Sequence, residues 1–181
     1  MRTSARSLIA LGILLSLGLA SCGSSPGAKP SASPSSGACN TGSTTTVLIP
    51  SSQRSPAGKW GSAPTVVVPS SAPPTKLECA DLIDGTGAAL KIGSVVTAQY
   101  VLATYSTHKV IQSSWTSQPF QFTVGTDIPG WNEGVVGMKA GGRRELIIPP
   151  ILGYGSTPPP GASGISVNDT LVFVIDAIST T

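Results

Sequence analysis

The sequence predicts an α+β fold, in which an antiparallel sheet of five to six strands curves around one short helix. Several segments rich in β-branched and aromatic residues alternate with a period of two, which is typical of strands. One segment, "IPGWNEGVVGMKAGGRR" at 128–144, starts with a Pro-Gly turn and holds a helix of barely two turns. The 181 residues, 40% hydrophobic and 10% charged, can bury one core of about 100 to 150 residues.

Residues 1–21 have the pattern of a secretory signal peptide. Arg2 and Arg6 precede an apolar run at 8–19, which is too short for a membrane-spanning helix of about 20 residues. The run ends in "LASC" at Cys22, which resembles the bacterial lipobox, where the cysteine is acylated and becomes the new N-terminus. An ordinary cleavage site beside an incidental cysteine is the alternative. We expect a mature chain without a transmembrane helix, lipid-anchored to the cell membrane through Cys22 and therefore extracytoplasmic.

Residues 22–57 are interpreted as a tether and residues 58–181 as the folded domain. The stretch 23–38 consists of Gly, Ser, Pro and Ala with one Lys, so it has little to bury and should behave as a linker. The stretch "TTTVLIP" at 44–50 is compatible with a short strand, especially if a disulfide holds it near the domain.

The cysteine count fits an exported chain. With Cys22 assigned to the lipid, Cys39 and Cys79 remain as a pair in an oxidising compartment, and we expect a disulfide between them. Two unpaired thiols are the alternative, because the sequence gives no distance between them. No metal site is expected, since His108 is the only histidine. Without the signal peptide the chain carries nine basic and eight acidic side chains, which gives no support for nucleic-acid binding.

The expected strands follow one another along the domain. The segment "PTVVVP" at 64–69 has Pro at each end of a β-branched run, the pattern of a short edge strand. "KLECADLIDGTGAAL" at 76–90 predicts a strand that ends in a Gly-rich turn. "SVVTAQYVLAT" at 94–104 predicts a long strand. The residues expected to share its inward face are Val96, Ala98, Tyr100 and Leu102. "PFQFTV" at 119–124 similarly places Phe120, Phe122 and Val124 on one face.

The helix is too short to be stable through its own hydrogen bonds, so packing must hold it. Trp131, near the start of the helix, is therefore expected to be covered by other groups rather than exposed. After the helix, a Gly-Gly turn leads into "RRELIIPP" at 143–150, where Leu146 and Ile148 share a face. The arginines at 143 and 144 are expected to be solvated rather than to form an anion site. The last strand, "DTLVFVIDAI" at 169–178, aligns Leu171, Phe173, Ile175 and Ala177.

These residues carry a family resemblance. "IPGWNEGVVGMKAGGRRELIIPPILGYG", followed by a loop and "NDTLVFVIDAI", resembles the FKBP family of peptidyl-prolyl cis/trans isomerases, the immunophilins that bind rapamycin and tacrolimus. The resemblance runs in order over a core at 76–178, and "SSWTSQPFQFTVG" fits as well. It implies an FKBP-like fold, with the segment 59–69 resembling an extra N-terminal strand of some members. It also implies an enzyme that isomerises Xaa-Pro bonds without a cofactor or covalent chemistry.

The resemblance also implies the residues of the site. Trp131 matches the floor beneath the prolyl ring, Ile128 a backbone N–H donor to the substrate, and Tyr154 a hydroxyl donor to a substrate carbonyl. The full substrate-binding set is Tyr100, Ile111, Phe120, Ile128, Trp131, Tyr154, Ile165 and Phe173. The catalytic set is Tyr100, Gln112, Tyr154 and Phe173. From composition alone, plain core packing would explain the aromatic residues, and only the family resemblance favours a pocket.

Two positions depart from the family pattern. Where members commonly read Phe-Asp-Ser-Ser, this chain has Ile111 and Gln112 before two serines. An aromatic wall becomes aliphatic, and a carboxylate becomes an amide that still donates and accepts hydrogen bonds but carries no charge. Substrate binding should survive this change better than turnover. The alternative to an isomerase is therefore a weakly catalytic or non-catalytic module, or chaperone, that grips proline-containing segments in the same pocket.

The remaining expectations concern partners and minor sites. Exported proline-containing polypeptides are the expected substrates, macrolides are candidate ligands, and the chain is expected to be a monomer. Asp127 is expected at the pocket rim and His108 in an exposed turn. A Ser-His-Asp hydrolase is rejected, because it would need that histidine and no Gly-x-Ser-x-Gly elbow occurs.

Overall fold

The computed structural model describes Cys39, Thr41 and residues 43–181. The expected signal peptide, the lipid anchor on Cys22 and most of the tether lie outside these residues. Within the described part of the chain, no helix is both long enough and apolar enough to cross a membrane.

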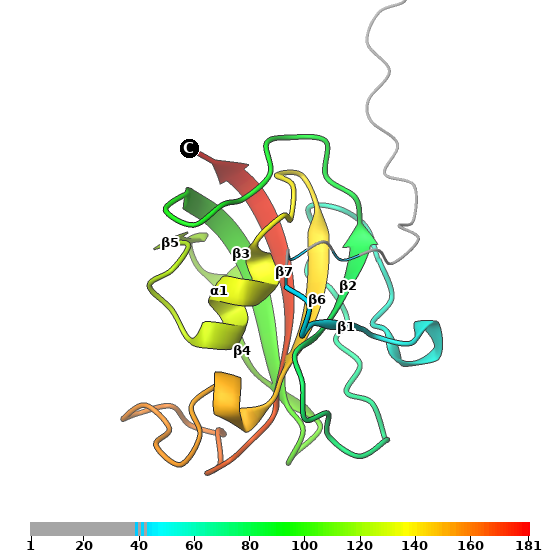
Figure 1. Cartoon of the computed structure of the whole chain (residues 1–181), viewed down its shortest axis with the longest axis vertical. Coiled ribbons are helices and arrows are strands. Elements are labelled where there is room, and N and C mark those ends of the chain that lie inside the picture. The colour runs from blue at the N-terminus through cyan, green and yellow to red at the C-terminus, as the bar shows by residue number, and fades with distance from the viewer. Residues whose placement is uncertain (1–38, 40, 42) are drawn as a thin grey trace, which may run out of the picture. The chain divides into compact units, whose positions relative to one another are not determined.

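One mixed sheet organises the described part of the chain (Figure 1). Its strands run in the order β1-β2-β6-β7-β3-β4, and β5 also pairs with β3. The elements are β1 (Val47–Leu48), η1 (Ser51–Gln53), β2 (Glu78–Ile83), β3 (Val95–Thr104), β4 (Lys109–Ser113), η2 (Ser114–Thr116), β5 (Phe120–Thr123), α1 (Pro129–Val135), β6 (Arg143–Ile148), η3 (Pro150–Leu152) and β7 (Leu171–Thr180). Every pairing is antiparallel except that of β1 with β2. The predicted fold class, a curved sheet with one short helix, is confirmed, but the described sheet has seven strands rather than five to six and is mixed rather than antiparallel, because β1 adds a short parallel strand beside β2.

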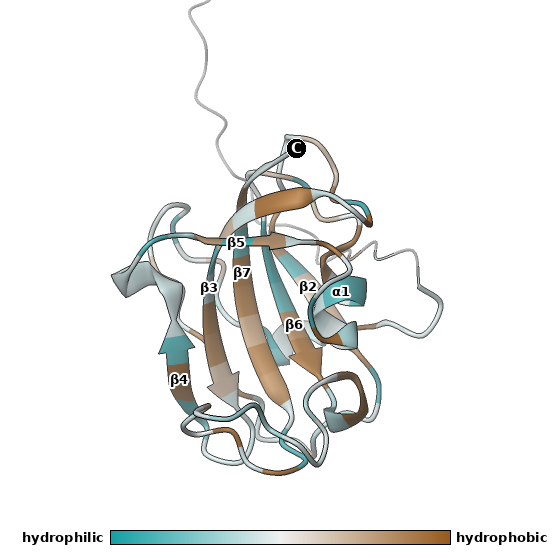
Figure 2. Ribbon diagram, turned by 90° about the vertical axis from the view of Figure 1, so that its left-hand side faces the viewer, coloured by the Kyte–Doolittle hydropathy of each residue, from teal (hydrophilic) through white to brown (hydrophobic). Residues whose placement is uncertain are grey.

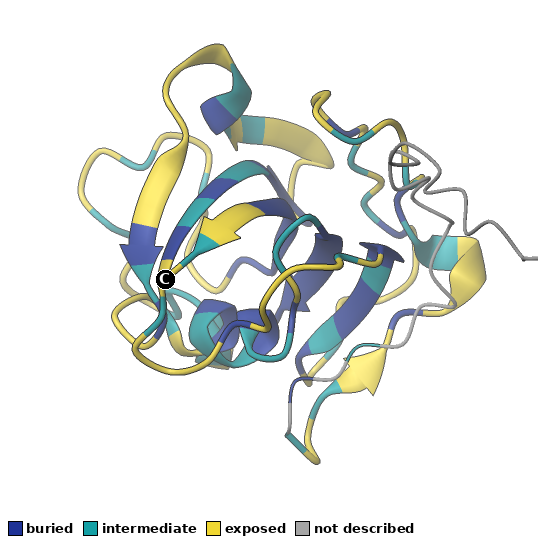
Figure 3. Cartoon of the chain, turned by 90° about the horizontal axis from the view of Figure 1, so that it is seen from above, coloured by how far each residue is buried: buried dark blue, intermediate teal, exposed yellow. Residues whose placement is uncertain are grey.

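Alternation along β7 divides its side chains between two cores, one on each face of the sheet. Phe173 and Ile175 pack into the core beneath α1, whereas Val172 and Val174 pack into a core on the opposite face. Hydrophobic residues accordingly follow the central strands (Figure 2), and so do the buried positions (Figure 3). The inward faces predicted for the long strands are confirmed, because their members belong to the core beneath α1 or pack against it.

The segment before β2 covers the face of the sheet opposite α1. We call residues 43–69 the N-terminal strap and the core on this face the outer core. In the strap, Ile49 is fully buried and Val66 and Val68 pack against the outer core. Because both faces are covered, β6 is buried along its whole length. The packed part of the chain therefore starts before the expected boundary at residue 58.

The edge strand predicted at 64–69 is absent, and with it the extra strand that the resemblance implied for 59–69. The prolines at its ends lack an N–H group, so they cannot donate to a strand ladder. The N–H of Val67 donates to the Ser55 hydroxyl (2.9 Å) instead of to a strand. The segment is held over the sheet by the packing of Val66 and Val68 and by the hydrogen bond of Val67 to Ser55.

The expectation that Arg143 and Arg144 are solvated is wrong, because both are at most 1% exposed. Arg143 forms a bidentate ion pair with Asp176 (2.5 and 2.7 Å). It also donates to the carbonyls of Ala57 and Ser62 in the strap. A buried guanidinium needs such a full set of acceptors, which here come from β7 and the strap.

Helix α1 lies close against β6 because of two glycines. A Cβ on Gly134 would approach Leu146 to 2.6 Å, and one on Gly130 would approach Ile148 to 2.3 Å. Pro129 occupies the first turn, where its missing N–H is tolerated and its φ suits a helix. The seven-residue helix is thus held by packing, as expected.

The expected disulfide joins Cys39 to Cys79 of β2. The segment that follows Cys39 also contacts the helix, because the hydroxyls of Thr45 and Thr46 donate to Glu133 of α1 (3.1 and 3.3 Å). The strap is therefore attached to both the sheet and the helix.

Candidate functional site

Strand register places three side chains of the candidate site in one row. Phe173 of β7 lies opposite Leu102 of β3, which in turn lies opposite Gln112 of β4. Residues opposite one another across antiparallel strands point to the same face. All three line a cavity of about 180 Å³ on the helix side of the sheet.

Aromatic rings form the floor and walls of this cavity. Trp131 is 4% exposed, and its ring meets Phe173 edge-on at 4.9 Å between centroids. Tyr100 and Phe120 stand edge-on to the same indole at 5.8 and 6.5 Å. Such edge-to-face arrangements are favourable for aromatic rings at these distances. Trp131 therefore lies beneath an aromatic cavity, which answers why a tryptophan starts so short a helix.

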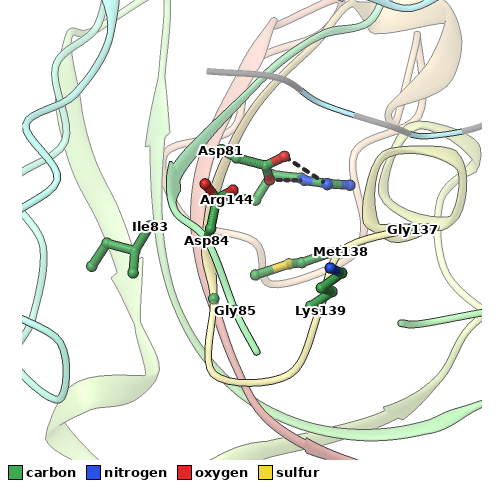
Figure 4. A pocket seen from close by; sticks show the side chains of 9 residues that line it. Asp81, Ile83, Asp84, Gly85, Gly137, Met138, Lys139 and Arg144 are labelled. Carbon is green, nitrogen blue, oxygen red and sulfur yellow. Dashed lines mark hydrogen bonds and ion pairs between the residues drawn. The ribbon is translucent and has the colours of Figure 1, made fainter. Parts of the chain in front are cut away.

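The position of Trp131 depends on Arg144, which the sequence interpretation placed in solvent. Arg144 donates to the carbonyls of Gly134 and Val136 at the end of α1 (2.9 and 3.0 Å). Its other nitrogens pair with Asp81 of β2 (2.6 and 3.1 Å) (Figure 4). A cation is favourable at a helix C-terminus, where backbone carbonyls lack partners. This buried ion pair thus joins the helix to two strands.

The loop before α1 is fixed by Asn132. Its side-chain oxygen accepts from the N–H groups of Gly125 and Asp127 (2.9 and 3.2 Å), and its amide donates to the Asp127 carbonyl (2.5 Å). Ile128, the next residue, lines the cavity. Within the described part of the chain its backbone N–H donates no hydrogen bond, so this donor remains open to a ligand.

The phenols of Tyr100 and Tyr154 share the cavity with Asp127. Burial raises the pKa of both tyrosines, and the nearby carboxylate of Asp127 raises each pKa further. Both phenols therefore stay protonated at neutral pH and can donate hydrogen bonds. Burial also raises the pKa of Asp127, although this residue lies at the exposed rim.

Two predicted residues lie beside this cavity rather than in it. Ile111 and Ile165 line a neighbouring cavity of about 440 Å³, together with the loop 159–163. Gln112 and Tyr154 line both cavities, so the two are adjacent. The structure thus gathers all the predicted substrate-binding and catalytic residues around one pair of cavities.

The sequence interpretation did not assign Leu102 or the loop 159–163 to the site. Leu102 had been placed on the inward face of its strand, but not in a pocket, because alternation does not separate core from cavity. The position of the loop follows from contacts that no periodicity encodes. In particular, Gly164, with a φ of +91°, lies so close to Ile111 that a Cβ would approach its Cγ2 to 2.8 Å.

The other features considered as possible sites lack a comparable aromatic cavity. Figure 4 shows a separate cavity of about 250 Å³, where the charge of Arg144 is balanced by Asp81. His108 is exposed in the β3–β4 turn, as expected, with a φ of 54°. Among the residues that the structure covers, no group of three His, Cys, Asp or Glu side chains could hold a metal ion.

Comparisons with known proteins agree on one family. A family model described as FKBP-type peptidyl-prolyl cis-trans isomerase matches residues 87–178, half of the chain. An FK506-binding protein of Streptomyces anulatus is 42% identical over 112 residues, which cover 59% of this chain and 88% of that protein. A probable FK506-binding protein of Corynebacterium glutamicum is 43% identical over 107 residues, with the same 59% and 88% coverage.

Solved structures show the same fold. The crystal structure of FkpA from Escherichia coli superposes with a TM-score of 0.54 at 34% identity. The match covers 59% of this chain but 49% of that one, so this chain spans about half the length of FkpA. The crystal structure of AtFKBP13 gives a TM-score of 0.53 at 32% identity and is covered to 98%.

Proposed function

This chain belongs to the FKBP-type peptidyl-prolyl cis-trans isomerase family, and we propose that the cavity above Trp131 is the site where it isomerises Xaa-Pro bonds. The members of this family are enzymes, and this chain is therefore one of them. The observation that carries the proposal is the buried indole of Trp131 beneath edge-on aromatic walls. This geometry offers an apolar seat to a prolyl ring.

The reaction requires no covalent step. Rotation about a peptide bond has a barrier of about 18 to 20 kcal/mol, so uncatalysed Xaa-Pro exchange takes tens to hundreds of seconds. The planar amide is stabilised by resonance and by solvation of its polar oxygen. A site that excludes water from the prolyl amide and binds the twisted form more tightly than either planar isomer therefore lowers the barrier.

The residues of the cavity fit these two tasks. In our proposal the prolyl ring rests on Trp131 between Tyr100, Phe120 and Phe173, which keep water away. The open N–H of Ile128 and the hydroxyl of Tyr154 then donate to substrate carbonyls and fix the chain on either side of the rotating bond. Preorganised donors of this kind stabilise a transition state without reorganisation.

Exported, proline-containing polypeptides are the proposed substrates, and macrolides are proposed ligands of the same cavity. Support comes from the signal-peptide pattern at 1–21 and the lipobox ending at Cys22, together with the names of the FK506-binding relatives. A lipid on Cys22 would hold the enzyme outside the cytoplasmic membrane, where such polypeptides fold.

A protease-free isomerisation assay tests the proposal. We expect the purified protein to accelerate cis/trans exchange of an Ala-Pro peptide, and Tyr154→Phe to reduce kcat/KM by about tenfold, because one hydrogen bond is lost in the transition state. Trp131→Leu should abolish most of the activity. The near-ultraviolet circular dichroism of each variant shows whether it is folded.

Tyr105→Phe provides the matched control. This tyrosine belongs to the outer core on the opposite face of the sheet, so the loss of its hydroxyl should leave kcat/KM unchanged. Full activity in a folded Tyr154→Phe and a folded Trp131→Leu would refute the assignment of the cavity.

A further inference from the structure

Asp127 is an exposed carboxylate at the rim of the proposed active-site cavity. It lines this cavity together with Trp131 and Tyr154 and directly precedes Ile128, whose N–H is open. Its backbone is fixed on both sides, because Asn132 accepts from its N–H and donates to its carbonyl. The side chain is therefore held at the rim by an ordered loop.

Nothing in the described part of the chain pairs with this carboxylate. Its oxygens accept no hydrogen bond there, and the two ion pairs of the described residues use Asp176 and Asp81 instead. Among the described residues that line the cavity, no other side chain is charged, and Gln112 contributes a neutral amide.

Two electrostatic effects accompany the position of Asp127 in the cavity lining. Burial raises the pKa of Asp127, which means that its charge is partly desolvated. That charge in turn raises the pKa of Tyr100 and of Tyr154. A cation bound nearby would favour the charged form of Asp127 and so offset its desolvation penalty.

We propose that Asp127 is a specificity-determining residue that favours substrates with a lysine or arginine next to the isomerised proline. The inference rests on the proposed function, because it assumes that the substrate backbone binds at the N–H of Ile128. A substrate residue adjacent to that hydrogen bond lies within reach of the preceding side chain, Asp127. A neighbouring glutamate in the substrate is correspondingly disfavoured.

The test compares peptides that differ at one residue beside proline. Lys, norleucine and Glu are placed either before or after the proline, and kcat/KM is measured with the full-length protein at low salt. We expect the Lys peptide to exceed the Glu peptide by about fivefold at one of the two positions, as for a partly exposed charge pair. The ratio should shrink when salt rises from about 0.02 to 0.5 M, because ions screen such pairs.

Asp127→Asn removes the charge with little change of shape, and its Lys-to-Glu ratio should fall to about one. Asp84→Asn removes the same charge outside this cavity and should keep the ratio of the unmodified protein. A ratio near one in the unmodified protein, or a ratio that survives in Asp127→Asn, overturns the inference.

The experiment distinguishes a failure of the proposed function from a failure of the inference about Asp127. If no peptide is isomerised, the function is refuted, and the same Lys-to-Glu comparison of peptide dissociation constants then decides the role of Asp127. If the norleucine peptide is isomerised but charge has no effect, the function stands and the inference fails.

Discussion

Burial raises the pKa of Glu145 to about 7, against an ordinary value of 4.5. This carboxyl is fully buried in β6, where the N–H and hydroxyl of Ser55 donate to it (2.8 and 2.5 Å). These hydrogen bonds and the charge of Arg54 lower the pKa, but desolvation is the larger effect. The attachment of the strap to β6 through Glu145 thus depends on pH.

The sign of the pH dependence follows from proton binding. Between pH 4.5 and 7 the folded protein holds the Glu145 proton more tightly than the unfolded chain does, so the free energy of unfolding falls as pH rises through this window. The loss attributable to Glu145 is about 3 kcal/mol by pH 8. In Glu145→Gln this contribution is absent. Measured by urea unfolding, the free energy of unfolding of the unmodified protein should therefore fall by about 3 kcal/mol more between pH 4.5 and 8 than that of Glu145→Gln. Parallel pH dependences would contradict the assignment.

The neutral amide of Gln112 leads to a prediction about catalysis. Gln112→Asp places a carboxylate beside the phenols of the cavity, and hydrogen bonds to a charged group are about 1 kcal/mol stronger than neutral ones. If that group contributes to the transition state, kcat/KM should rise by about fivefold. The control is Gln121→Asp, the same substitution at an exposed residue of β5. An unchanged kcat/KM would mean that the neutral amide does not limit catalysis.

Individual residues were predictable where periodicity or the family pattern determines them. Alternation correctly assigned Tyr100 and Phe173 to the inward face of the sheet, but a strand pattern does not distinguish a cavity wall from core. Arg143 and Arg144 were misjudged, because their partners Asp176 and Asp81 lie 33 and 63 residues away. A local sequence window contains no sign of such pairs.

At the scale of elements, the strap is the feature that local sequence predicted least well. Its short strand β1 was anticipated from the stretch 44–50, but the segment 64–69 was not a strand. The strap is instead attached by the disulfide, by Glu145 with Ser55, and by Arg143 with two backbone carbonyls. Side chains of the sheet supply most of these contacts, so the strap sequence alone does not reveal them.

The disulfide should stabilise the fold substantially. Cys39 and Cys79 are 40 residues apart in sequence, and closing a loop of that length restricts the unfolded chain by about 4 kcal/mol in the chain-entropy model. We expect a reductant to lower the free energy of unfolding by up to this amount, measured by urea titration. Cys39→Ser should show the lower stability from the start and no response to reductant. Equal stability of the oxidised and reduced forms would contradict this prediction.

At the scale of the whole molecule, the two faces of the sheet in the described part of the chain have different coverings. One face of the sheet carries α1 and the aromatic cavity, whereas the other is sealed by the strap. The family resemblance made the first face predictable down to single residues. The second face was not predictable in this way, because the resemblance over 76–178 does not extend to residues 43–69.

The central claim is that proline binds and isomerises above Trp131. One nuclear magnetic resonance sample tests it directly, with the full-length 15N-labelled protein at a low ratio to an Ala-Pro peptide. The indole N–H signal of Trp131, which has no hydrogen-bond partner among the described residues, should shift on peptide addition. Trp60, outside the set of cavity-lining residues, serves as the internal reference.

In the same sample, exchange peaks should appear between the cis and trans forms of the peptide at mixing times too short for uncatalysed exchange. Both observations together are the predicted result. Exchange without a shift of the Trp131 signal would place catalysis elsewhere on the molecule. A shift without exchange would show a proline-binding module in place of an isomerase, and either outcome would contradict the proposed mechanism.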